Sequence, residues 1–217
     1  MASSAVQIQP PNGKVIRQTP RSLAHVVLRT TPENYKPMTQ FYCNLLNAHV
    51  VHADPVLTFM AYDDEHHRIA LICSPDALPK PAGTTTYAGL DHIAFSYPTL
   101  TALAQQYVFL KACEKPILPL WTVNHGPTTS MYFRDPDGNK IELQVDNFDD
   151  VDEANNFMAG PKYDMNPMGT DFDPDEWSEY ILSKALPNGE EGLSPTEVKA
   201  LKMRKDIGER KELPEGF

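Results

Sequence analysis

The sequence predicts an α+β fold of two consecutive βαβββ modules with a helical C-terminal extension. A β-type segment that carries a histidine occurs twice, as LAHVVLR at residues 23–29 and as LDHIAFSY at residues 90–97. Each copy is followed by an amphipathic helical pattern and then by further β-type segments. After residue 149 the sequence becomes polar, with separate helix-start signals. An internal repeat of this kind indicates two related structural units.

The first module begins with the strand at 23–29. Thr31 and Pro32 then resemble a helix start, with Thr as the cap and Pro in the first turn. Apolar residues at helical spacing follow them. The predicted elements are a strand at 23–29, a helix at 31–46 and strands at 47–51, 57–63 and 67–74.

The second module ends in a hairpin, because Asp135-Pro-Asp-Gly-Asn139 supplies the residue types that a tight turn requires. Side chains alternate between faces along a strand. Ile141, Leu143 and Val145 therefore share one face, and Glu142 and Gln144 share the other; Tyr132 faces away from Met131 and Phe133. The predicted elements are a strand at 90–97, a helix at 99–115 and strands at 118–123, 130–134 and 140–145.

The remaining segments flank this domain, which we expect to span 21–149 with modules at 21–75 and 89–149. Residues 1–20 lack periodicity and predict a flexible arm. Residues 151–169 are polar and predict irregular structure. In the C-terminal extension, 150–217, we expect a short helix near 175–185 and a charged helix from the Ser194 capping signal to about residue 210.

Composition excludes several classes of protein. The chain has 217 residues and a formal net charge of -10, which disfavours binding to nucleic acid. No run of eighteen apolar residues and no signal peptide is apparent, so we expect no membrane association. Three separated cysteines form no CxxC pair and favour a reducing compartment, the cytoplasm. Sheet edges and a long tail favour a homo-oligomer, a dimer or higher.

Three residues on separate predicted strands form a candidate metal centre: His25, His92 and Glu142. A lone histidine is more often structural, but the repeat places His25 and His92 at equivalent positions of the two modules. Two histidines and one carboxylate on one side of a metal leave open positions opposite, as in non-haem Fe(II) enzymes. The sequence therefore predicts an Fe(II) site, with Mn(II) as the alternative.

With these motifs in order, residues 23–148 resemble the vicinal oxygen chelate superfamily of glyoxalases, bleomycin-resistance proteins and extradiol dioxygenases, and most closely its type I extradiol ring-cleavage dioxygenases. The resemblance implies a half-open barrel around a metal held by His25, His92 and Glu142. HHRIALI resembles the strand whose leading histidine lies over the metal, which indicates His67 or its neighbour His66. NHGPTTSMYF resembles the segment that lines the substrate pocket with a histidine and a tyrosine, here His125 and Tyr132.

The resemblance implies an Fe(II)-dependent extradiol dioxygenase that cleaves a small aromatic diol, a catechol, with O2. His67 would act as acid–base near O2, and His125 and Tyr132 would bind the substrate oxygens. Residues 69–73 lack the glutamate ligand of glyoxalases, which favours a three-ligand oxygenase site. Trp121, Phe133, Phe148 and the extension would line a pocket for a bulky catechol.

Two other functions stay open at this point. One is a metal-dependent isomerase or lyase of the same fold that acts on an aromatic or polyketide-like secondary metabolite. Oxygen consumption with a catechol distinguishes it from a dioxygenase. The other is a metal-free resistance protein that binds an aromatic ligand. Such proteins generally lack the three metal-ligand positions, all of which this sequence has.

Overall fold

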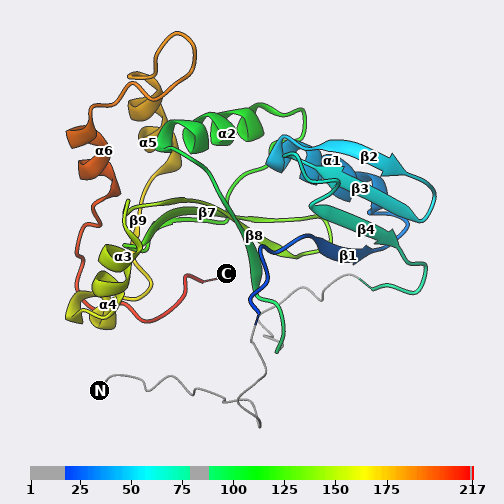
Figure 1. Ribbon diagram of the computed structural model, residues 1–217, viewed down its shortest axis with the longest axis horizontal. Coiled ribbons are helices and arrows are strands. Elements are labelled where there is room, and N and C mark those ends of the chain that lie inside the picture. The colour runs from blue at the N-terminus through cyan, green and yellow to red at the C-terminus, as the bar shows by residue number, and fades with distance from the viewer. Residues whose placement is uncertain (1–17, 79–87, 216) are drawn as a thin grey trace.

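The protein folds into two open mixed β-sheets that lie side by side, one from each module (Figure 1). The structure is a computed structural model that describes residues 18–78, 88–215 and 217. Most of the predicted N-terminal arm and the middle of the segment between the modules lie outside these residues. Neither sheet closes into a barrel within the described chain. The α+β class and the two βαβββ modules are confirmed.

The first module contains one helix and a four-stranded sheet of order β1-β4-β3-β2. β1 and β4 run parallel, and the other neighbours are antiparallel. Its helix begins later than predicted, because the Thr31 hydroxyl accepts from the amide of Asn34 in a preceding turn. The elements are β1 (Val26–Thr30), α1 (Tyr35–Leu46), β2 (His49–Ala53), β3 (Leu57–Ala61) and β4 (Ile69–Cys73).

The second module repeats this arrangement, with sheet order β5-β8-β7-β6-β9 and a parallel β5–β8 pair. The Thr99 hydroxyl caps α2 by accepting from the amide of Ala102 at 3.0 Å. The predicted hairpin joins β7 and β8. The elements of this module are β5 (His92–Ser96), α2 (Leu100–Ala112), β6 (Trp121–Asn124), β7 (Thr128–Arg134) and β8 (Lys140–Asp146).

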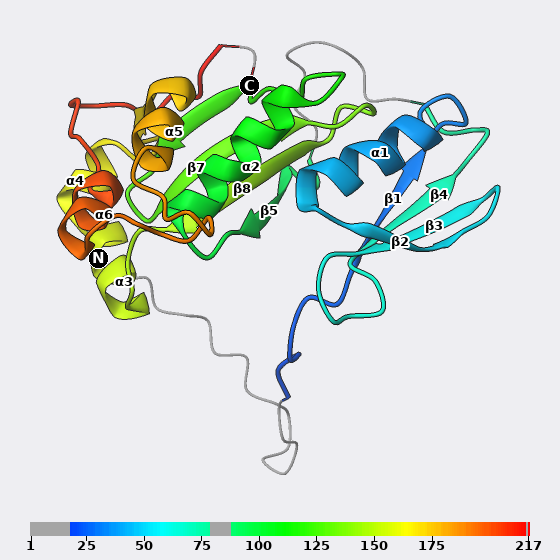
Figure 2. The ribbon, with the colours of Figure 1, turned by 90° about the horizontal axis from the view of Figure 1, so that it is seen from above.

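One continuous apolar core joins the two modules. Both α1 and α2 lie on the same side of the sheets (Figure 2). β8 turns Ile141, Leu143 and Val145 into this core, as the alternation predicts. Burial of such side chains stabilises the fold by about 1.5–3 kcal/mol each. The opposite face of β8, which carries Glu142, is thereby left for the site.

Polar contacts also join the modules. The buried Tyr42 hydroxyl of α1 donates to Oδ2 of Asp135, in the β7–β8 turn, at 2.9 Å. The Tyr97 hydroxyl donates to the carbonyl of Leu45 at 3.1 Å. Because these bonds connect α1 to the second module, they fix how the two sheets lie relative to one another.

The C-terminal extension packs on the second module, on the side away from the first (Figure 1). β9 adds a fifth strand beside β6, and α5 packs against α2. No helix among the described residues has the length and apolar character needed to cross a membrane. The elements are α3 (Val151–Met158), α4 (Pro161–Met165), β9 (Thr170–Asp171), α5 (Pro174–Leu182) and α6 (Pro195–Lys202).

Two expectations for this extension were wrong. Residues 151–169 are not irregular throughout, because the Asp150 carboxylate caps α3 and Pro161 opens α4. The last helix ends at Lys202 rather than near residue 210. The capping box of Ser194 and Glu197 at its start is present.

Candidate active site

Strand register gathers three of the predicted residues on one face of the second sheet. Tyr132 of β7 lies directly opposite Glu142 of β8. Ala94 of β5 lies opposite Glu142 on the other side, and His92, two residues earlier, shares the face of Ala94. This is the face that points away from the core. His92, Glu142 and Tyr132 therefore form a group across three adjacent strands.

Within this group His92 and Glu142 are in direct contact, with 3.0 Å between Nε2 and Oε2. Asp91 Oδ1 lies 2.8 Å from the other ring nitrogen, Nδ1. Glu142 is 5% exposed. Burial works to raise the pKa of Glu142, but hydrogen bonds from His92 and Ser130 hold it below its usual value. The hydrogen bond to Glu142 raises the pKa of His92, against the effect of burial.

His125 and Tyr132 lie beside this pair. Nε2 of His125 is 2.9 Å from the Tyr132 hydroxyl, which also hydrogen-bonds Glu142. Burial lowers the pKa of His125 and raises the pKa of Tyr132. Gly126 follows with a φ of 103°, where a Cβ atom would collide with the Phe157 ring. The glycine in NHGP therefore sets the turn that carries His125.

The other two predicted residues form a separate group at the start of the first sheet. The rings of His25 and His67 lie 4.4 Å apart, between centroids, and the His67 ring stacks on Phe59 at 4.7 Å. His67, rather than the exposed His66, turns toward His25. Burial, followed by the charges of His25 and His66, lowers the pKa of His67.

The structure does not bring His25 to His92 and Glu142. Across residues 18–78, 88–215 and 217, no group of three His, Cys, Asp or Glu side chains is close enough to hold a metal. The His92–Glu142 pair nevertheless has the donor chemistry of a metal site. A metal-bound histidine usually has its second nitrogen held by a carboxylate, as Asp91 holds Nδ1 here. Nε2 and a buried carboxylate oxygen then remain as neighbouring ligands.

A largely buried aromatic cluster adjoins the group on the second sheet, with Trp121 and Tyr132 only 6% and 5% exposed. The Trp121 ring stacks on Tyr132 at 5.2 Å, and the Phe217 ring lies 4.9 Å from each of them. The Phe133 ring is not part of this cluster, because alternation turns it into the core, where it is 0% exposed. Phe148 packs on Phe157 of α3 instead.

Asp91 and Phe217 were missed in the sequence. The position of Asp91, directly before a candidate ligand, was a signal that could have identified it. Phe217 lies 96 residues from Trp121 along the chain, and no local pattern connects the two.

Comparison with known proteins gives consistent matches. A sequence model described as "Glyoxalase/Bleomycin resistance protein/Dioxygenase superfamily" matches residues 22–143. "Biphenyl-2,3-diol 1,2-dioxygenase 2" of Rhodococcus globerulus is 46% identical over 172 residues, 79% of this chain and 84% of that protein. "Biphenyl-2,3-diol 1,2-dioxygenase 3" of the same organism is 46% identical over 72% of this chain and 79% of its own.

Solved structures also resemble this chain. The lactoylglutathione lyase of Agrobacterium tumefaciens is 19% identical, with a TM-score of 0.44 over 59% of this chain and 96% of its own.

Proposed function

We propose that this chain cleaves a bulky catechol with O2 at an Fe(II) held by His25, His92 and Glu142. The chain belongs to the glyoxalase/bleomycin resistance protein/dioxygenase superfamily and is an extradiol ring-cleavage dioxygenase. A 1,2-dioxygenase of a 2,3-diol, as the relatives are named, opens the ring next to the two hydroxyl-bearing carbons rather than between them. That position is extradiol.

The observation that carries the metal assignment is the His92–Glu142 pair. Its 3.0 Å contact puts an imidazole nitrogen and a buried carboxylate side by side, with Asp91 fixing the ring from behind. Two of three facial ligands are thus adjacent on one sheet. His25 lies exposed, directly before β1, and we propose that it completes the set when the metal binds. Mn(II) suits the same ligands.

When bound, the metal stabilises the ionised diol and brings it together with O2. This chain's own residues would orient the substrate. His125 Nε2 and the Tyr132 hydroxyl are 2.9 Å apart beside Glu142, where they can hydrogen-bond the diol oxygens. Either group can hold the proton that a substrate hydroxyl loses. We propose these two as substrate-binding residues.

We propose that His67 acts as an acid–base group near O2. Its Nδ1 lies 2.6 Å from Nδ1 of His66, which leaves Nε2 as the atom that holds or moves a proton. Its contact with the His25 ring supports a position beside the metal. Stacking on Phe59 fixes the ring plane.

The aromatic cluster supports a substrate with a second ring. Trp121 and Tyr132 are buried under the Phe217 ring, next to His92, whose ring lies 5.5 Å from that of Tyr132, and we propose that the second ring packs at Phe217. Aromatic contacts of this kind contribute about 0.5–1.5 kcal/mol each beyond their buried area. The second ring of a biaryl diol such as biphenyl-2,3-diol would contact Phe217, whereas catechol, bound at Tyr132 through its two oxygens, has no ring to place there.

Oxygen uptake after anaerobic loading with Fe(II) tests the proposal. With biphenyl-2,3-diol we expect stoichiometric uptake and a coloured, ring-opened keto acid that carries two atoms from ¹⁸O2. Biphenyl-2-ol, which cannot chelate through two oxygens, is the matched control and should give none. Tight metal binding without uptake on any diol would contradict the dioxygenase and favour a non-oxidative metalloenzyme. Failure to bind metal would contradict the proposed ligands.

A further inference from the structure

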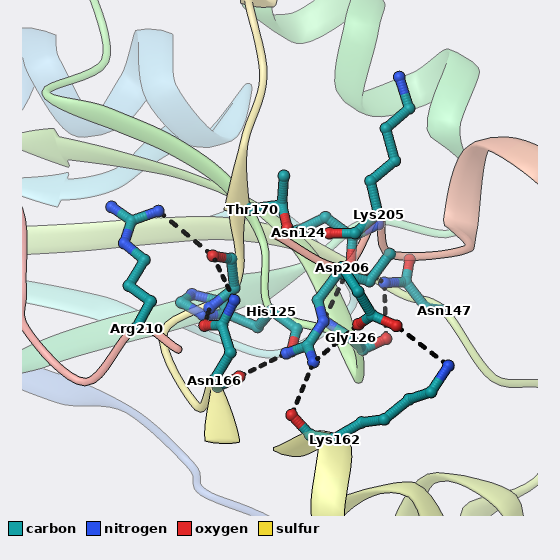
Figure 3. A network of polar contacts seen from close by, with 12 residues as sticks. Asn124, His125, Gly126, Asn147, Lys162, Asn166, Thr170, Lys205, Asp206 and Arg210 are labelled. Carbon is teal, nitrogen blue, oxygen red and sulfur yellow. Dashed lines mark hydrogen bonds and ion pairs between the residues drawn. The ribbon is translucent and has the colours of Figure 1, made fainter. Parts of the chain in front are cut away.

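Arg204 lies buried between the C-terminal extension and the turn that carries His125. It is 8% exposed. Its Nη1 donates to the carbonyl of His125 at 3.1 Å and to that of Asn166 at 2.5 Å, and Nη2 donates to that of Lys162 at 3.0 Å. Figure 3 labels these three partners, His125, Asn166 and Lys162. One guanidinium therefore joins three segments: the turn after β6, the end of α4 and the chain that follows α6.

The Arg204 guanidinium is buried at a cost in free energy, which indicates that its contacts in this place have a role. The only carboxylate partner described for it is Asp206, at 3.4 Å, and its buried Nε has no partner in the described chain. The Phe157 ring lies 5.2 Å from the guanidinium carbon. Removing a charge from water is costly, and only close pairing offsets that cost. The planar fork of arginine fits several carbonyls at fixed angles, which the single ammonium of lysine cannot do.

Further side chains, beyond Arg204, hold this turn and the end of β6. Asn147 Nδ2 donates to the carbonyl of Gly126 at 2.8 Å, and Asn124 Nδ2 donates to the carbonyl of Lys202 at 3.0 Å. The ring of His125 hydrogen-bonds the backbone of Met168. The backbone and the ring of His125 are thus both held by the C-terminal extension, and Nε2 remains directed at Tyr132.

We propose that Arg204 is a positioning residue for the reaction: it holds the His125 backbone so that Nε2 meets the diol oxygens. This inference rests on the proposed role of His125. It assigns a function to the extension, whose residues otherwise lie outside the two modules. A displacement of about 1 Å at a substrate-positioning group can lower the rate about a hundredfold.

A double-mutant cycle tests the inference, because it separates action through His125 from a general effect on the fold. We would measure kcat, KM and bound iron for Arg204→Met, His125→Ala and the double variant. Methionine fills the space of the arginine stem without its donors. We expect Arg204→Met to lower kcat/KM about tenfold or more in the parent, but less than about twofold in His125→Ala. Iron content should stay unchanged, because the proposed ligands lie on β5, β8 and before β1.

Lys162→Met is the matched control. Its Nζ pairs with Asp206 at 3.0 Å and joins the same two parts of the extension, but it does not contact His125. We expect parent activity from this variant. Arg204→Lys keeps the charge and loses the fork, so its kcat/KM should lie between those of the parent and Arg204→Met. If Arg204→Met fails to fold, the same cycle is measured with Arg204→Lys.

Equal losses in the parent and in His125→Ala would overturn the inference, since Arg204 would then stabilise the fold alone. Parent activity in Arg204→Met would overturn it as well. An active His125→Ala with parent kcat/KM is a different failure: it would remove His125 from the proposed function. The three results are distinguishable in one set of four proteins.

Discussion

Replacing Tyr42 by Phe should loosen the junction between the modules. The Tyr42 side chain is 0% exposed and that of Asp135 only 4%, and their hydrogen bond of 2.9 Å joins α1 to the β7–β8 turn. The substitution removes one donor from a buried carboxylate. Asn139 still donates to the same oxygen at 2.8 Å, so Asp135 keeps part of its stabilisation.

The expected loss is the value of one hydrogen bond to a charged group, about 1.5–3 kcal/mol in the free energy of unfolding. For a chain of this length it corresponds to a fall in Tm of about 3–12 °C. Urea unfolding at neutral pH, followed by circular dichroism, measures the free energy. Tyr107→Phe is the matched control, because its hydroxyl donates to the exposed Asp175 and its loss should cost less.

The loss should also depend on pH. Burial raises the pKa of Asp135, while hydrogen bonds from Asn139 and Tyr42 oppose that rise. A carboxyl whose pKa is raised by folding destabilises the protein as pH rises through that pKa, and without the Tyr42 hydroxyl this penalty grows. The difference between Tyr42→Phe and the parent should therefore shrink as pH falls and Asp135 becomes protonated. A difference below about 0.5 kcal/mol at neutral pH, or one that grows in acid, would refute the reasoning.

Three further predictions concern the site itself. Glu142→Ala should abolish iron retention, measured by metal analysis after desalting; an iron-replete, active variant would contradict the ligand assignment. His67→Ala should keep iron and anaerobic binding of the diol but lower kcat by about 10²–10⁴-fold. Unchanged turnover would exclude His67 from the reaction. Phe217→Ala should raise KM for biphenyl-2,3-diol about fivefold and leave KM for catechol unchanged, because only the second ring contacts Phe217. An equal change for both diols would contradict that contact.

The part of the site on the second sheet could be predicted because side chains alternate between faces along a strand and paired strands set residues opposite one another. Alternation along β8 separates Glu142 from the core residues on either side of it, and the hairpin sets Tyr132 opposite. The repeat identified His92 at the start of the parallel partner strand. Alternation and pairing were enough to place these three side chains on one face, but Tyr132 was identified as a site residue only by the resemblance to extradiol dioxygenases. Their grouping follows from the sequence wherever the strands pair in this register.

Other features of the extension were not predicted. The Asp150 cap and the apolar face of α3 are local signals that the sequence analysis did not use, whereas α4 has only five residues, too few to show helical periodicity. The contact between Arg204 and His125 spans 79 residues, and only tertiary packing creates it. His25 was predicted inside a strand, but pairing of β1 with β4 begins one residue later, at Val26 and Ile69.

Comparison of the two modules explains why only one of them supplies a carboxylate. His25 and His92 occupy equivalent places, directly before Val26 and Ile93. In the second module Ala94 pairs with Glu142; the equivalent pair in the first module is Val27 with Ala70. An alanine thus stands where a second carboxylate would be. The repeat could have provided two sites of this kind, and the sequence of β4 leaves only the one proposed at His92 and Glu142.

This asymmetry makes the proposed site depend on the junction between the modules. His92 and Glu142 are held on one sheet by strand pairing, whereas His25 lies directly before β1 of the other sheet, outside the pairing of β1 with β4. Its distance from the pair is set by how α1 sits against the β7–β8 turn, where Tyr42 meets Asp135. Because a metal bound by all three residues would cross-link the sheets, its binding free energy would add to the stability of that junction. A substitution that weakens the contact between the modules is therefore expected to lower the metal affinity as well.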